Sequence, residues 1–163
     1  MASSRIDQLL RKVEDEFRTP LSEIEAGKKT GHWMWWIFPQ AKGLGTSPTA
    51  KDYAIESLDE AVACLADPVF GDRYCQMVDA VWSQVVINGT AVKTLFSGSR
   101  SPDDRKLVSS LTLFRRAAEH LTQLQRLEPD RRTFSLLIHQ STEILERAEG
   151  EGLGPCSISQ GLE

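Results

Sequence analysis

HWMWWIFPQ, residues 32–40, holds three of the four tryptophans of a chain in which only 7% of residues are aromatic. Whether its backbone is extended or helical, the apolar side chains of this segment point in every direction, so it must be covered on both sides. Each aromatic ring can bury roughly 150–250 Å², and we therefore expect the segment to anchor the core. Two interpretations stay open: the rings are packing core, or they form the wall of a site in which His32 and Gln40 meet a ligand.

Apolar residues on both sides of this segment recur at helical spacing, and strand-like alternation is nowhere sustained in the sequence. Ser47, Asp67 and Ser101 each place a capping oxygen directly before a proline, a pattern typical of helix starts. The sequence therefore predicts an all-α fold, a single compact orthogonal bundle of about six to seven helices with the aromatic segment in its core. The expected helices cover residues 6–17, 20–27, 48–65, 68–88, 90–96, 102–121 and 129–145.

The length of 163 residues is that of one domain with a hydrophobic core of its own. We expect residues 1–149 to form this single helical domain. Residues 150–163 contain four glycines and show no apolar periodicity, so they are expected to be a flexible C-terminal tail.

The charge balance argues against a general nucleic-acid binder, because the net charge is −4 and the basic pairs at 28–29, 115–116 and 131–132 are most simply solvated helix ends and faces. The three cysteines form an odd set without metal-type spacing, so no disulfide framework, metal site or cofactor is predicted. The N-terminus lacks the pattern of a signal peptide, and no apolar run approaches the roughly 18–20 residues of a membrane span. We therefore expect a cytoplasmic protein that does not enter a membrane.

A glycine loop, AKGLGTSP, follows the aromatic segment and leads to a helix start at Ser47. Gly43 and Gly45 would let a ligand approach the backbone closely, and the N–H groups at the helix start could hold an anion. An ordinary turn is the alternative interpretation.

Polar residues also occur on a helix face that should be buried. In SPDDRKLVSSLTLF, residues 101–114, Asp103 and Ser110 fall in one band with apolar residues, and Lys106 lies at its edge. Such conflicts with the amphipathic pattern tend to mark functional or networked sites. A structural role stays open as well, since Asp103 could complement the helix dipole or pair with Lys106 at the surface. If the aromatic segment forms a site, these residues are its expected partners.

Three longer stretches carry a resemblance to a known family: AGKKTGHWMWWIFPQAKGLGTSPTAKDYAI, SLDEAVACLADPVFG and PDDRKLVSSLTLF, with EPDRRT as a weaker echo. Over roughly residues 6–147 the chain resembles the bacterial and fungal domain of unknown function 1810, some members of which are labelled calpastatin-like. The resemblance implies an all-helical fold and no established activity. Asp67, where members often have histidine, and Tyr74 and Cys75, in a usually aliphatic region, depart from the family pattern. The positions that match it are Lys29, His32, Trp33, Trp35, Phe38, Pro39, Gln40, Gly43, Gly45, Ser47, Tyr53, Asp103, Lys106, Ser110, Thr112 and Phe114.

The first functional hypothesis is a pocket for a small polar or anionic ligand, with or without catalysis. In its catalytic form His32 would be the acid or base, Asp103 would orient it, and Lys106 would stabilise developing negative charge. The alternative is a non-catalytic helical protein–protein interaction module. A weaker third hypothesis, stacking of single-stranded nucleic acid on an exposed tryptophan, conflicts with the acidic balance. The expected ligand-binding residues are Lys29, Trp33, Trp35, Gln40, Gly43, Gly45, Ser47, Tyr53 and Ser110.

Overall fold

The computed structural model describes residues 4–98, 102–125 and 134–163, and within these ranges the fold is all-α, as predicted. Six of its helices have eight residues or more, in agreement with the expected number. The only extended pairing among the described residues is an isolated parallel bridge between Ala41 and Ile55. The elements are α1 (Arg5–Asp15), α2 (Arg18–Glu25), α3 (Met34–Ile37), α4 (Pro48–Asp52), α5 (Leu58–Ala66), α6 (Pro68–Trp82) with a π-helical continuation (Ser83–Ile87), α7 (Val92–Leu95), α8 (Asp103–Gln125), α9 (Ser135–Gly150) and α10 (Ser157–Gly161).

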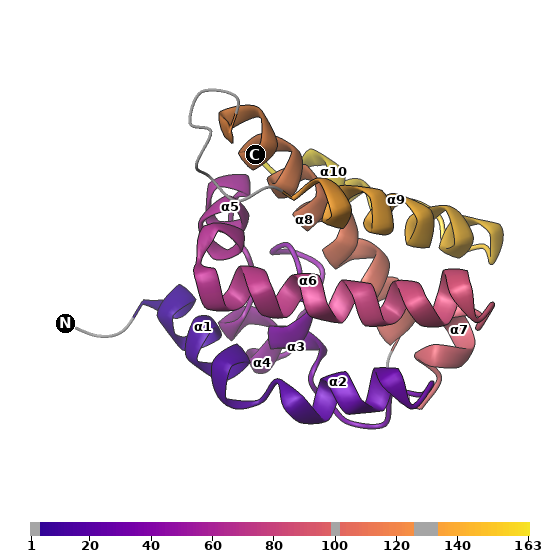
Figure 1. Ribbon diagram of the computed structural model, residues 1–163. Helices are drawn as coiled ribbons and strands as arrows, with labels where there is room; N and C mark the ends of the chain where they lie inside the picture. Colours follow the sequence, from indigo (N-terminus) through magenta and orange to yellow (C-terminus); the bar gives the residue numbers. More distant parts are fainter. Residues whose placement is uncertain (1–3, 99–101, 126–133) are drawn as a thin grey trace.

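Helix α6 runs through the middle of the molecule, with α1 and α2 on one side and α9 on the other (Figure 1). Helix α8 packs against α5 and α9 and completes the second side. The aromatic segment forms the short helix α3, which contacts both α1 and α8. Its Phe38 is fully buried, with the rings of Tyr74 and Phe96 at centroid distances of 5.8 and 6.3 Å. The expected burial of this segment inside a helical bundle is confirmed.

Two of the expected proline-marked helix starts are present. The hydroxyl of Ser47 accepts a hydrogen bond from the backbone N–H of Ala50 at the start of α4, and the carboxylate of Asp67 accepts bonds from Val69 and Phe70 at the start of α6. These side chains satisfy N–H groups that have no partner within their helices. The third expected cap at residue 101, and the start of the last helix at residue 129, lie outside the described residues.

One predicted helix is in fact two. The apolar stripe over residues 48–65 suggested a continuous helix, but α4 ends at Asp52 and α5 begins at Leu58. Between them the backbone of Ile55 donates to the carbonyl of Gln40 and accepts from the N–H of Lys42, each at 2.8 Å. These groups would be needed for helical hydrogen bonds, so pairing with a distant part of the chain interrupts the helix.

Residues 150–163, for which the sequence predicts a flexible tail, contact the helical domain in the structure. They include α10, which packs on α8, and the side chains of Leu153 and Leu162 are only 5% and 8% exposed. The guanidinium of Arg116 donates to the backbone carbonyls of Ser159 and Leu162, both at 2.8 Å. Two leucines spaced among glycines produce no helical periodicity, but both are buried with the hydrophobic core, which holds the segment in place.

Candidate functional site

A buried ion cluster joins the aromatic segment to the start of α8. The carboxylate of Asp103 is 3% exposed, and the ammonium of Lys29 lies 2.7 Å from its Oδ2 with only 1% of that side chain exposed. The ammonium of Lys106, which is 24% exposed, lies 3.3 Å from Oδ1 of the same carboxylate. Lys29 also donates a hydrogen bond to the carbonyl of Gly31. Charged side chains are almost never this deeply buried unless they are paired, so Asp103 is the group that permits Lys29 to be inside.

Each lysine of this cluster also lies over a tryptophan of the aromatic segment. The ammonium of Lys29 is 4.7 Å from the centroid of Trp33, and that of Lys106 is 5.4 Å from the centroid of Trp35, both distances suited to cation–π attraction. At the end of the segment the Gln40 amide donates to the backbone carbonyl of Lys106 at 2.7 Å. The structure thus brings together residues that the sequence places far apart, and the contacts fasten the segment to the first turns of α8.

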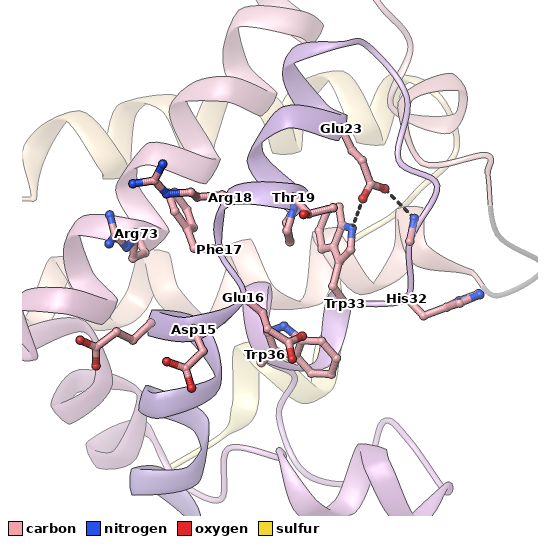
Figure 2. Close-up of a pocket in the computed structure, with 13 residues that line it drawn as sticks. Asp15, Glu16, Phe17, Arg18, Thr19, Glu23, His32, Trp33, Trp36 and Arg73 are labelled. Atoms are coloured by element: carbon pink, nitrogen blue, oxygen red, sulfur yellow. Dashed lines mark hydrogen bonds between the residues drawn. The ribbon is translucent and has the colours of Figure 1, made fainter.

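Glu23 organises the turn before the aromatic segment, and the sequence did not single it out. One carboxylate oxygen of Glu23 accepts hydrogen bonds from the backbone N–H groups of Thr30 and Gly31 and from the Thr30 hydroxyl, at 2.5–2.9 Å. The other accepts from the indole N–H of Trp33 at 3.1 Å (Figure 2). Partial burial raises the pKa of Glu23, but these hydrogen bonds outweigh that effect and hold its pKa below the ordinary value.

We expect Glu23→Gln to lower the free energy of unfolding by about 1–2 kcal/mol at pH 7, since hydrogen bonds to a charged acceptor are replaced by weaker ones. A depressed folded-state pKa stabilises the protein above the ordinary carboxyl pKa, and the contribution disappears as the pH falls through the folded-state value. The two proteins should therefore approach each other in stability at low pH. Urea unfolding at pH 7 and pH 3 measures both effects, with the exposed neighbour Glu25→Gln as control. A loss of equal size at both pH values would contradict this role for the carboxylate.

His32 does not join the ion cluster. Its side chain is exposed and extends away from Trp33 and Trp36 at the mouth of a cavity of about 500 Å³ (Figure 2). Lys106 lines a different cavity, and both carboxylate oxygens of Asp103 are engaged by lysines. The expected arrangement, in which Asp103 orients a catalytic His32 beside Lys106, is therefore not the one in the structure. The sequence around His32 does not indicate the direction in which its imidazole ring points.

Ser110 lies in the core rather than in a cavity. It is fully buried, and its hydroxyl is 3.0 Å from the hydroxyl of Tyr74. Burial raises the pKa of Tyr74 well above its ordinary value, so the phenol stays protonated throughout the neutral range. The hydroxyls of Ser110, on the buried face of α8, and Tyr74, which departs from the family pattern, thus form a hydrogen bond with each other.

Tyr74→Phe is expected to lower the free energy of unfolding by about 1 kcal/mol, because the hydroxyl of Ser110 stays buried without this partner. The double variant Tyr74→Phe/Ser110→Ala should recover part of that loss, since both polar groups are then gone. Urea unfolding of the two single variants and the double variant gives the coupling energy. Strictly additive losses would show that the two hydroxyls do not interact.

A second cavity, of about 270 Å³, lies where Trp35, Gln40 and the glycine loop meet Lys106. Three lysines surround it, and we call it the lysine pocket. Its volume suits a small ligand rather than a large cofactor. It is lined by Trp35, Gln40, Ala41, Lys42, Gly43, Leu44, Gly45, Ala50, Lys51, Ala54, Glu56 and Lys106.

The glycine loop has the backbone geometry that its sequence suggested. Gly43 has φ +90°, a conformation that side-chain-bearing residues rarely adopt, and a Cβ on Gly45 would lie 2.4 Å from the Cβ of Ala50. No described residue accepts a hydrogen bond from the N–H groups of Gly43, Leu44 or Gly45. These donors are therefore available to a ligand.

Two further residues expected at the site do not line the lysine pocket but support it. The hydroxyl of Ser47 caps α4, which carries the pocket residues Ala50 and Lys51. The ring of Tyr53, at the end of the same helix, lies 5.6 Å from that of Trp36 between their centroids. Of the expected ligand-binding residues, Trp35, Gln40, Gly43 and Gly45 line this pocket together with Lys106, whereas Lys29 and Trp33 belong to the buried cluster.

The lysine pocket is positively charged in a protein whose net charge is −4. Its lining contains three lysines, Lys42, Lys51 and Lys106, and one carboxylate, that of Glu56. The Glu56 carboxylate lies 3.5 Å from the guanidinium of Arg5. Within the described part of the chain no ion pair engages Lys42 or Lys51. The sequence did not single out these two lysines, although Lys42 lies in the glycine loop and Lys51 follows it by three residues.

Residues 4–98, 102–125 and 134–163 contain no group of three or more histidine, cysteine, aspartate or glutamate side chains placed to hold a metal ion. None of the helices described in these ranges is long and apolar enough to cross a membrane.

Comparison with known proteins adds one family and one structure. The profile of a family described as "Protein of unknown function (DUF1810)" matches residues 4–135. The fold is similar to the crystal structure of the conserved hypothetical protein Rv1873 from Mycobacterium tuberculosis, with 31% sequence identity, a TM-score of 0.69, and coverage of 92% of this chain and 89% of that one. No curated protein matches the chain. The matched residues include the buried ion cluster and the whole lysine pocket.

Proposed function

This chain belongs to the DUF1810 family of proteins of unknown function, and we propose that it binds a small anionic ligand in the lysine pocket. The observation that carries the proposal is the convergence of three lysine side chains around Trp35 and the glycine loop, against a single carboxylate, in an acidic protein. A phosphate or carboxylate group is the ligand chemistry that such a site favours.

The pocket offers three kinds of contact to such a ligand. The ammonium groups of Lys42 and Lys51 supply charge, and the unengaged N–H groups of residues 43–45 supply directed donors. The ring of Trp35 supplies an apolar wall. Lys106 keeps its ion pair with Asp103 and adds positive potential from the floor of the pocket.

The buried cluster has a supporting role in this proposal. Asp103 holds Lys106 beside Trp35, and the Gln40 amide holds the backbone of Lys106 against the segment. These contacts set the position of two walls before any ligand arrives, which lowers the entropy lost on binding. His32, in another cavity, takes no part in it.

Calorimetric titration with inorganic phosphate tests the proposal. Exposed ion pairs contribute about 0.2–1 kcal/mol each, so the double variant Lys42→Gln/Lys51→Gln should bind phosphate about two- to thirtyfold more weakly. Affinity should also fall as salt is added, because the lysines are solvent-exposed.

The matched control is Lys28→Gln/Lys93→Gln, which makes the same change in net charge at two exposed lysines outside the pocket. This control should bind phosphate as the unmodified protein does. Equal weakening in both double variants would reduce the effect to bulk charge and refute a specific site, as would the lack of saturable phosphate binding by the unmodified protein.

We also propose the cytoplasm as the location of the protein. Support comes from the thiols of Cys64, which is buried, and Cys156, which is partly buried; neither forms a disulfide with a described residue, and thiols persist in a reducing compartment.

A further inference from the structure

A larger cavity adjoins the lysine pocket and differs from it in chemistry. It has a volume of about 420 Å³, and its walls include the apolar side chains of Leu44, Val108, Leu153 and Pro155. Its one charged lining residue is Arg105, which is exposed. We call it the apolar cavity. It lies between α8 and the C-terminal segment, where Leu153 is buried.

The two cavities share a wall. Leu44, the middle residue of the glycine loop, lines both of them. Successive residues on an α-helix point about 100° apart, and on α8 Arg105 borders the apolar cavity while Lys106 borders the lysine pocket. Leu44 and two neighbouring residues of α8 thus separate a cationic cavity from a mainly apolar one.

We propose that the lysine pocket and the apolar cavity form one composite site for an anion with a short apolar arm, of the chemical class of a short-chain alkyl phosphate. The inference rests on the proposed function, because the anionic group is placed among Lys42, Lys51 and Lys106. The arm extends over Leu44 and lies against Val108 and Leu153. The anionic group is assigned to the lysine pocket because three lysines line that pocket, whereas Arg105 is the single charged residue that lines the apolar cavity.

The composite site makes affinity depend on the length of the arm. Burial of one methylene group multiplies an affinity about fourfold. Inorganic phosphate should bind most weakly, and ethyl, butyl and hexyl phosphate should bind progressively more tightly until the apolar cavity is full.

The experiment is calorimetric titration of the full chain with this series of phosphates, repeated on Gly154→Phe. Gly154 lines the apolar cavity, and a Cβ there meets no atom within 4 Å, so the new ring can enter the cavity without touching the lysines. The matched control is Gly150→Phe, at another glycine with open space that does not line either cavity. Leu44→Ser provides a second test at the shared wall.

In the unmodified protein and in Gly150→Phe we expect affinity to rise with chain length. In Gly154→Phe the rise should be abolished while the affinity for inorganic phosphate is unchanged, and in Leu44→Ser the rise should be smaller. Binding of phosphate without any gain from an alkyl chain would overturn the composite site and leave the proposed function intact. A gain that persists in Gly154→Phe would also overturn it. If neither phosphate nor any alkyl phosphate binds, the proposed function itself fails.

Discussion

Replacement of Asp103 by alanine is expected to destabilise the protein by about 3–5 kcal/mol, the loss typical of a buried charge left without its partner. The ammonium of Lys29 would remain 1% exposed, with the Gly31 carbonyl and the Trp33 ring but no counter-charge. Lys106, at 24% exposed, can turn toward solvent and would lose less. Urea unfolding measures the change.

The ion cluster is asymmetric, and this asymmetry gives a sharper test. Lys29→Met should destabilise less than Asp103→Ala, because Asp103 keeps its contact with Lys106. The double variant Lys29→Met/Asp103→Leu removes both deeply buried charges and should recover much of the loss. Asp104→Ala, one position further along α8 and outside the cluster, is the control and should stay within about 1 kcal/mol of the unmodified protein. A loss in Asp103→Ala no larger than in Asp104→Ala would contradict the proposed burial of the pair.

Phe38→Ala should lower the free energy of unfolding by about 3–5 kcal/mol, the range for loss of a fully buried phenyl ring with the cavity it leaves. Phe38 is 0% exposed and its ring contacts Trp33, Tyr74 and Phe96. Tyr74 and Phe96 come from distant parts of the chain, so the ring ties the aromatic segment to α6 and to the end of α7.

Two variants calibrate this result under the same urea unfolding conditions. Phe38→Leu fills most of the space and should destabilise far less than Phe38→Ala. Leu136→Ala removes a side chain that is 64% exposed and should change stability by less than about 0.5 kcal/mol. If Phe38→Ala were as mild as Leu136→Ala, the aromatic segment would not be the centre of the core.

Local patterns were enough to predict the helical class and most helix positions. Leu9 and Val13 belong to an apolar stripe of α1, and Asp67 caps α6 directly before Pro68. Both features depend only on neighbouring residues in the sequence. The split between α4 and α5 could not be predicted, because the backbone of Ile55 pairs with residues on the far side of the glycine loop. The packing of residues 150–163 on α8 is likewise a long-range effect, produced by Leu153 and Leu162.

The candidate site was predictable only in part: Trp35, Gln40 and Lys106 were expected to line it, but Lys42 and Lys51 were not. The polar residues on the buried face of α8 predicted Asp103 and Lys106 as partners of the aromatic segment; Lys106 contacts Trp35 and Gln40, whereas Asp103 contacts the two lysines. The sequence could not show that Lys29 is the deeply buried partner of Asp103, or that His32 faces a different cavity. The direction of a side chain depends on the tertiary fold, and local sequence patterns do not determine it.

The small-anion site in the lysine pocket can be tested at the level of single residues by two-dimensional amide NMR during titration with inorganic phosphate. We expect saturable shifts in the backbone amides of Gly43, Leu44 and Gly45 and in the indole N–H of Trp35. These shifts should weaken strongly in Lys42→Gln/Lys51→Gln. Saturable shifts that leave these four signals unmoved and concentrate elsewhere on the protein, or no saturable shifts at all, would contradict it.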